Sequence, residues 1–165
     1  GVKNSENHKV EETDGAQVEE EEAKYELSLY YNDRVKQHAQ NFEEIQSRCE
    51  LIYEELEKQR ILKSDKISLP SFSEIDLEFL QKVHSKCLIE KIMSSEKLEE
   101  DEIEYIFDKE CIQNRFTPEC SKLAAGSALE AMKDVLSSPC AVKSAFCLVR
   151  PPGHHASTNY SNGTC

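Results

Sequence analysis

The stretch AFCLVRPPGHHA, residues 145–156, indicates the fold class of this chain of 165 residues. It opens on five apolar residues, and a short apolar run bounded by turn residues is typical of a buried strand. Proline has no N–H to donate to a ladder, so Pro151 and Pro152 end that strand, and the glycine after them allows a tight turn. We therefore expect an interior strand that delivers two adjacent imidazoles, His154 and His155, to the floor of a pocket just beyond its end.

Two successive histidines after such a turn suit acid–base chemistry. Because histidine titrates near neutral pH, His154 and His155 can divide proton transfer and charge stabilisation between them. A lone pair of histidines is more often an exposed polar pair or half of an adventitious metal site. The complete heptapeptide RPPGHHA, residues 150–156, following an apolar strand, favours the catalytic interpretation.

The upstream sequence predicts α/β architecture. Apolar residues alternate with polar ones from Leu27 to Tyr31, which indicates a strand with one buried face. An apolar stripe with helical spacing then predicts a helix to about Lys58; its members are Ile45, Cys49, Ile52 and Leu56. Thr117, as the cap, and Pro118 predict the start of a helix that packs small residues against the sheet. A strand, several helices and a second strand imply an α/β fold.

Two further segments show weaker sequence patterns. A helix is expected to begin at Ser73, whose hydroxyl caps it, with Asp76 three residues on as a weak capping box. Its inward face is expected to carry Leu77, Leu80 and Val83. The charged stretch 91–108 is predicted to form surface helix and loop.

Composition limits the function. Asp and Glu outnumber Lys and Arg by 32 to 20, giving a net charge of −12. Such a surface repels phosphate backbones, so we expect no direct nucleic-acid binding; it suits lysine-rich partners, although solvated charge is the commoner case. No membrane-spanning run or signal peptide is visible, and we expect no membrane association. The seven cysteines form no C-x-x-C pair and are interpreted as reduced and intracellular.

The chain divides into two parts. Residues 1–24 carry eight acidic and three basic side chains with almost nothing apolar, so we predict a disordered acidic leader. Residues 25–165 are predicted to form the N-terminal part of a larger domain. The chain begins with Gly1, and Cys165 falls inside a motif that is expected to continue; we therefore expect a piece of a longer protein.

The heptapeptide RPPGHHA closely resembles the active-site motif of class II histone deacetylases and their relatives, the acetylpolyamine amidohydrolases. Residues 28–38 resemble the opening strand, acidic residue and histidine of this family. Residues 48–62, 74–92 and 123–138 resemble its successive helices. The resemblance implies the deacetylase (arginase-like) fold, a mostly parallel sheet flanked by helices, present here only as an N-terminal portion.

The same resemblance implies the chemistry. Family members remove acetyl groups from lysine with one Zn²⁺ and a bound water, and His155 would be the general base with His154 as its electrostatic partner. The family's Asp-x-His ligand pair and second aspartate lie beyond the tandem histidines, so we expect no metal ligands in this chain. His38 and His84 are interpreted as hydrogen-bonded structural residues. This polypeptide alone is therefore expected to be inactive.

The chain departs from the family pattern near the substrate. Gly163 and Thr164 stand where Gly-Phe is usual, so Thr164 replaces an aromatic wall of the acetyl-lysine tunnel. A rim acid that holds the substrate backbone would be Glu110, or Asp108 by an alternative alignment. Residues 42–48 keep the Glu and Arg of a family pattern but lack its His and prolines.

Three functions remain open. The leading interpretation is a zinc-dependent deacetylase acting on acetyl-lysine of histones or other proteins, in the nucleus and/or cytoplasm, with corepressor-type proteins as further partners. The second is an inactive deacetylase-like module that binds partners. The third is an acetylpolyamine deacetylase.

Overall fold

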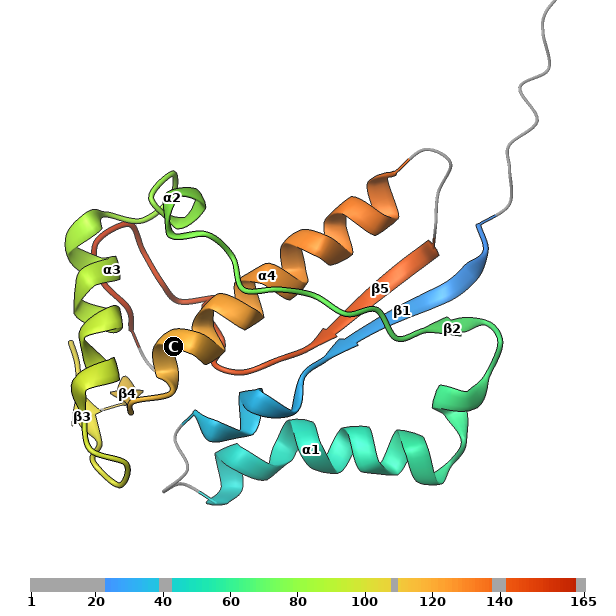
Figure 1. The fold of residues 1–165 in the computed structure, drawn as a ribbon, viewed down its shortest axis with the longest axis horizontal. Coiled ribbons are helices and arrows are strands. Elements are labelled where there is room, and N and C mark those ends of the chain that lie inside the picture. The colour runs from blue at the N-terminus through green and yellow to red at the C-terminus, as the bar shows by residue number, and fades with distance from the viewer. Residues whose placement is uncertain (1–22, 39–42, 108–109, 138–141, 163–165) are drawn as a thin grey trace, which may run out of the picture.

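The computed structural model describes residues 23–38, 43–107, 110–137 and 142–162. The predicted acidic leader lies outside these ranges except for its last two residues. Within them, the centre of the fold is a parallel three-stranded sheet in the order β2-β1-β5 (Figure 1). Strand β1 (Tyr25–Tyr31) pairs with β2 (Ile67–Ser68) on one side and with β5 (Val142–Leu148) on the other.

Two long helices cover opposite faces of this sheet, α1 (Glu43–Lys58) and α4 (Thr117–Leu136). Successive side chains of a strand point to opposite faces. Tyr31 stacks on Tyr53 of α1, with ring centroids 4.2 Å apart, whereas Tyr30 bonds to Asp134 of α4. The predicted α/β fold, a parallel sheet flanked by helices, is confirmed.

Strand β1 is buried on both faces at its centre, which corrects the expectation of one buried face. Ser28, Leu29 and Tyr30 are each at most 3% exposed, although they are consecutive. Leu29 joins Val35 and Leu148 in the core beneath α1. The covering helices account for the difference, because alternation in the sequence does not reveal that α4 lies over the second face.

The stripe predicted on α1 is only partly used. Cys49 is buried and Leu56 packs against the same core, but Ile52 is 45% exposed. None of the five described cysteines takes part in a disulfide; they are Cys49, Cys87, Cys111, Cys120 and Cys147. No helix in the described part of the chain is both long and apolar enough to cross a membrane.

The predicted helix from Ser73 is wrong in its start. Residues 69–76 form an extended segment across α4, and the helix α2 spans only Leu77–Leu80. The backbone of this segment is held by α4, since the N–H of Ile75 donates to the carbonyl of Lys122 over 3.1 Å. Val83, expected to face inward, is 62% exposed. Tertiary contact with α4 therefore overrides the local helix signal.

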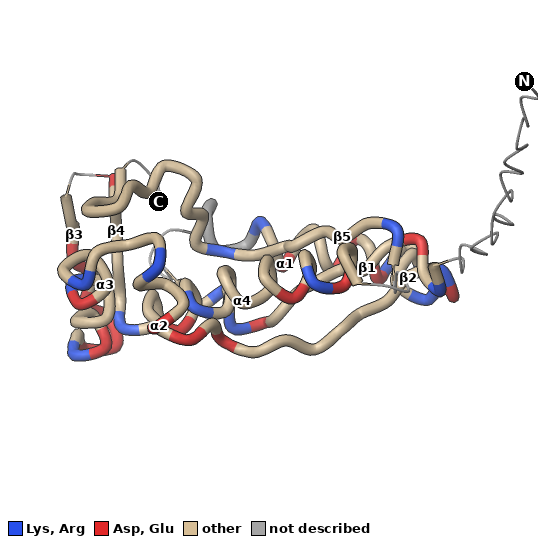
Figure 2. The backbone as a smooth tube through the Cα atoms, turned by 90° about the horizontal axis from the view of Figure 1, so that it is seen from above, with Lys and Arg blue, Asp and Glu red and all other residues tan. Residues whose placement is uncertain are grey.

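The carboxyl ends of β1 and β5 point towards the side of the molecule that carries α3, β3 and β4 (Figure 1). There, α3 (Lys86–Met93) lies beside a small antiparallel pair, β3 (Glu104–Tyr105) and β4 (Ile112–Gln113). The predicted surface helix and loop at 91–108 thus takes the form of the end of α3, a 3-10 turn and β3. Acidic and basic residues are interspersed along α1, α3 and α4 (Figure 2).

Gly126 lets α4 pack closely against residues 69–76, the extended segment that crosses this helix. A Cβ at Gly126 would overlap the carbonyl oxygen of Ser73. By helix propensity alone, Gly126→Ala would raise stability by about 0.5–1 kcal/mol. We expect the overlap to outweigh this, with a net loss of about 1–3 kcal/mol in the free energy of unfolding measured by urea titration. Gly153→Ala, where a Cβ meets nothing within 4 Å, is the control and should change little. A more stable Gly126→Ala variant would contradict the close packing.

Candidate functional site

The candidate site lies where β1 and β5 end. Because the strands are parallel, the turn η1 (Asp33–Gln37) after β1 and the loop after β5 emerge at one edge of the sheet. Ligands of parallel α/β sheets bind at this carboxyl edge. The predicted strand before the histidine motif is confirmed as β5 (Val142–Leu148), but β5 is an edge strand of the described sheet and Phe146 is 53% exposed. The expectation of an interior strand is corrected in that respect.

The loop brings His154 and His155 side by side. Their ring centroids are 4.1 Å apart and the ring planes are inclined by 48°. Both residues are exposed, contrary to the expected position at a pocket floor. A turn closed by the Ala156 N–H and the Gly153 carbonyl, 3.0 Å apart, spans the two histidines, while Pro152 and Gly153 line a cavity. The loop therefore lines the cavity on one side and leaves the histidines at the surface.

Hydrogen bonds fix the far end of this loop to the start of α3. His84 Nδ1 lies 2.8 Å from the carbonyl oxygen of Ser157, and the Ser85 N–H donates to the carbonyl of Thr158 over 2.7 Å. Ser85 also caps α3 through its hydroxyl. The interpretation of His84 as a hydrogen-bonded structural residue is confirmed.

His38 anchors the segment after β1 to the start of α4. It is 7% exposed, and its Nδ1 lies 3.0 Å from Thr117 Oγ1. The same hydroxyl accepts from the Asn114 N–H over 2.8 Å, and Asn114 Nδ2 donates to the Gln37 carbonyl over 2.8 Å. The structural interpretation of His38 is confirmed. The cap prediction is off by one residue: Phe116 precedes the helix and Thr117 is its first residue.

Burial changes the titration of His38. Loss of hydration lowers the pKa of His38 to about 4, with the positive charge of Arg150 as a smaller contribution in the same direction. His38 is therefore neutral at pH 7. A neutral imidazole has one donor and one acceptor nitrogen.

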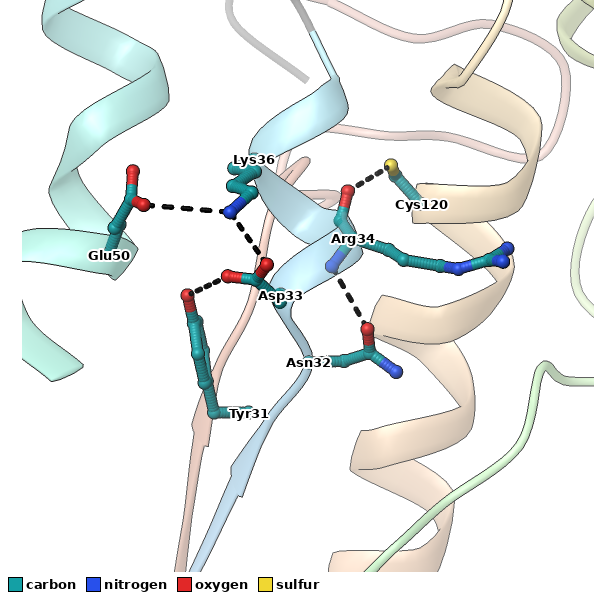
Figure 3. Close-up of polar contacts among 7 residues, drawn as sticks. All are labelled: Tyr31, Asn32, Asp33, Arg34, Lys36, Glu50 and Cys120. Atoms are coloured by element: carbon teal, nitrogen blue, oxygen red, sulfur yellow. Dashed lines mark hydrogen bonds and ion pairs between the residues drawn. The ribbon is translucent and has the colours of Figure 1, made fainter.

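A polar network holds η1 between α1 and α4 (Figure 3). Lys36 Nζ lies 2.6 Å from the Asp33 carboxylate and 3.6 Å from that of Glu50 on α1. The hydrogen bond from Lys36 lowers the pKa of Asp33, and the Asp33 carboxylate also accepts from the Tyr31 hydroxyl. On the other side, Cys120 Sγ of α4 donates to the Arg34 carbonyl over 3.2 Å. These contacts position the segment that carries His38.

A cavity of about 320 Å³ lies behind the histidine loop. Its walls come from α3, α4, the segment around Ile106 and the loop itself, and most of them are apolar. His38 and His84 line it, whereas His154 and His155 do not. The cavity and the two exposed histidines therefore lie on opposite sides of one loop.

The described residues do not fit a zinc ion. Among them, no group of three or more His, Cys, Asp or Glu side chains is placed to hold a metal. Of the substrate-contacting residues expected from the sequence, Gly163 and Thr164 lie outside the described ranges, as does Asp108. Glu110 is exposed and directly precedes Cys111 and β4.

Asn114 and Ser157 are the residues that sequence reasoning missed. Asn114 Oδ1 accepts from the Phe116 N–H over 3.1 Å, and Ser157 Oγ lies 3.1 Å from the Tyr160 N–H. Asn and Ser often make such local side-chain bonds at turns, so their positions beside a helix start and a loop offered a signal. No signal in the sequence indicated that Asn114 bonds to Gln37 or that Ser157 bonds to His84.

The pKa of His38 predicts an acid-sensitive fold. Between pH 6.5 and about 4 the unfolded chain binds more protons than the folded chain, so the free energy of unfolding should fall as pH drops through this window. The loss should reach up to about 3 kcal/mol at the acid end, and stability should be retained in full above pH 6.5. Urea unfolding across pH 7 to 4 measures it. His38→Gln should flatten this dependence and His155→Gln should keep it; equal slopes for both variants would contradict the assignment.

A family profile described as histone deacetylase domain matches residues 42–165. Over 95 residues the chain is 37% identical to histone deacetylase clr3 of Schizosaccharomyces pombe, covering 56% of this chain and 13% of that protein. It is 36% identical over 98 residues to polyamine deacetylase HDAC10 of Mus musculus, covering 58% and 14% respectively.

A solved structure of the HDA15 HD domain superposes with a TM-score of 0.74 at 25% identity. This match covers 85% of the present chain and 39% of that domain's chain. The chain therefore spans well under half of the solved domain and a smaller part of the curated relatives.

Proposed function

This chain belongs to the histone deacetylase family, and we propose that it forms the N-terminal part of a zinc-dependent hydrolase that removes acetyl groups from lysine. The proposed substrates are histones or other acetylated proteins. The family match over residues 42–165, which includes the RPPGHHA motif, is the observation that carries the proposal.

We assign His155 as general base and His154 as its electrostatic partner. Their loop follows β5 at the carboxyl edge of the sheet, where a bound substrate is expected. The loop is held to α3 through Ser157 and Thr158, which supports a fixed position for the paired rings. A neutral imidazole in this place can accept a proton from an attacking water and return it to the leaving amine.

The rest of the catalytic machinery is proposed to come from other parts of the whole protein. The described residues do not fit zinc, so we assign no metal-dependent step to them. Further residues are also needed to cover the two exposed histidines. Accordingly, we propose that residues 1–165 alone are inactive. We also propose that the whole protein resides in the nucleus and/or the cytoplasm and has corepressor-type proteins as partners.

A small acetylated polyamine is a second candidate substrate. The similarity to a polyamine deacetylase of Mus musculus is 36% over 98 residues, close to the 37% found for histone deacetylase clr3. The two identities are nearly equal, so the similarity supports both substrate classes. An inactive module that binds partners is the third candidate, favoured by the loss of the His and prolines in residues 42–48.

The decisive experiment uses the whole protein that contains this chain. We expect zinc-dependent release of acetate from acetyl-lysine peptides at higher kcat/KM than from acetylated polyamines. His155→Ala should lower kcat/KM by roughly 10²- to 10⁴-fold. His8→Ala, outside the family match, is the matched control. Full activity in His155→Ala, or zinc-dependent turnover by residues 1–165 alone, would contradict the proposal; no turnover of either substrate would support the binding module.

Thr164 gives a test of the substrate tunnel. If Thr164 replaces an aromatic wall, Thr164→Phe should restore contact with the lysine stem and tighten acetyl-lysine peptide binding by about two- to tenfold. Isothermal titration with the whole protein measures this change. Thr13→Phe adds the same ring outside the family match and should leave affinity unchanged. Unchanged affinity in Thr164→Phe would remove Thr164 from the tunnel.

A further inference from the structure

We propose that a groove between α1 and the segment after β2 binds an extended, proline-rich peptide that carries a lysine or arginine. The groove consists of two adjoining hollows, which share no lining residue with the cavity behind the histidine loop. Peptide binding there is a property separate from the proposed deacetylation, so its test needs no turnover.

The first hollow lies where β2 parts from β1. The two strands pair only at Leu27 and Ser28 of β1, and the chain after β2 then crosses towards α4. A hollow of about 330 Å³ opens between this segment, the end of β1 and α1. Its lining residues are mostly apolar or aromatic; they are Leu29, Tyr31, Asn32, Tyr53 and residues 69–72. The hollow therefore offers rings to an extended ligand.

Two stacked tyrosines form the wall that both hollows share. Tyr31 of β1 and Tyr53 of α1 have ring centroids 4.2 Å apart and ring planes inclined by 21°. Both pack against the core that contains Leu29, so the rings are held in place from below. Aromatic-lined grooves suit the polyproline II conformation, because such a segment is already extended and loses little entropy on binding.

Polar side chains beside these rings can satisfy the peptide backbone. A polyproline II segment makes no internal hydrogen bonds, so its carbonyls need donors. Asn32 Oδ1 accepts from the Arg34 N–H over 3.0 Å, which leaves Nδ2 as the donor (Figure 3). Ser71 adds a hydroxyl on the opposite wall. Across the part of the chain that the structure describes, neither Asn32 Nδ2 nor the Ser71 hydroxyl has a hydrogen-bond partner.

The second hollow, of about 390 Å³, adds negative charge to the aromatic wall. Asp33 and Glu50 line it, and Lys36 lies between their carboxylates (Figure 3). Glu54 and Glu57, one turn apart on α1, also line it and take part in no ion pair with any described residue. Four carboxylates thus face one ammonium group. A cation placed here gains from the carboxylates and from the neighbouring ring faces.

This charge selects the occupant. A basic side chain complements the second hollow while prolines occupy the first, so one peptide of mixed composition fits both. The acidic residues 1–24 of this chain carry the same sign of charge as the hollow and are repelled by it. A second copy of the chain, with a net charge of −12, is disfavoured for the same reason.

Three labelled peptides test the proposal by fluorescence anisotropy with the whole protein that contains this chain. The first is RPPLPPR, whose arginine at either end places a cation in the acidic hollow in both binding directions. QPPLPPQ removes the charge, and RGGLGGR keeps the charge but removes the prolines. We expect saturable binding of RPPLPPR with a Kd on the order of 100 μM, and affinities at least fivefold lower for the other two. Added salt should weaken RPPLPPR.

Variants with matched controls locate the binding. Glu54→Gln combined with Glu57→Gln should weaken RPPLPPR about five- to tenfold and leave QPPLPPQ unchanged. Glu78→Gln combined with Glu90→Gln removes the same charge from α2 and α3 and should change neither. Tyr53→Leu should weaken both proline-rich peptides, whereas Phe79→Leu on α2 should not. Thermal unfolding by circular dichroism verifies that each variant is folded.

The other outcomes each overturn the proposal. Equal binding of RGGLGGR and RPPLPPR would indicate a basic partner without proline recognition. A concentration-dependent dimer in sedimentation velocity that Tyr53→Leu abolishes would make a second copy the occupant. No saturable binding of RPPLPPR, or equal weakening by the two pairs of glutamate substitutions, would remove the groove as a peptide site.

Discussion

The parallel pairing of β1 with β5 is the constraint on which the rest of the structure depends. These strands lie near opposite ends of the described chain, and their register sets Leu29 beside Phe146 and Tyr31 beside Leu148. Because both run in one direction, the segments that follow them emerge together. His38, on one segment, and the histidine loop, on the other, thus share an edge only once this non-local pairing has formed.

Four histidines at this edge show how strongly environment determines what one residue type does. Burial removes water from His38 and keeps it neutral. His84 holds the loop in place through its hydrogen bond with the Ser157 carbonyl. His154 and His155 lie in contact with each other at the surface. The first two stabilise the framework through their hydrogen bonds, whereas the second two are the pair proposed to be catalytic.

Local patterns predicted the elements but not their surroundings. Alternation found β1, helical spacing found α1, and the proline pair marked the end of β5. The helix expected from Ser73 failed because α4 binds the backbone at Ile75, a contact that no local signal encodes. The tandem histidines could be identified from the motif alone. Their exposure could not, since it depends on which side of the loop faces α3 and α4.

The histidine loop separates two environments of opposite character. Its far end is held to α3 at Ser157 and Thr158, whereas the turn that carries the imidazoles is closed by the Gly153–Ala156 hydrogen bond. Pro151 and Pro152 line the cavity, whereas His154 and His155 are exposed on the other side of the loop. The position of His154 and His155 therefore depends on the strand that precedes the loop and on the hydrogen bonds that hold the loop in place.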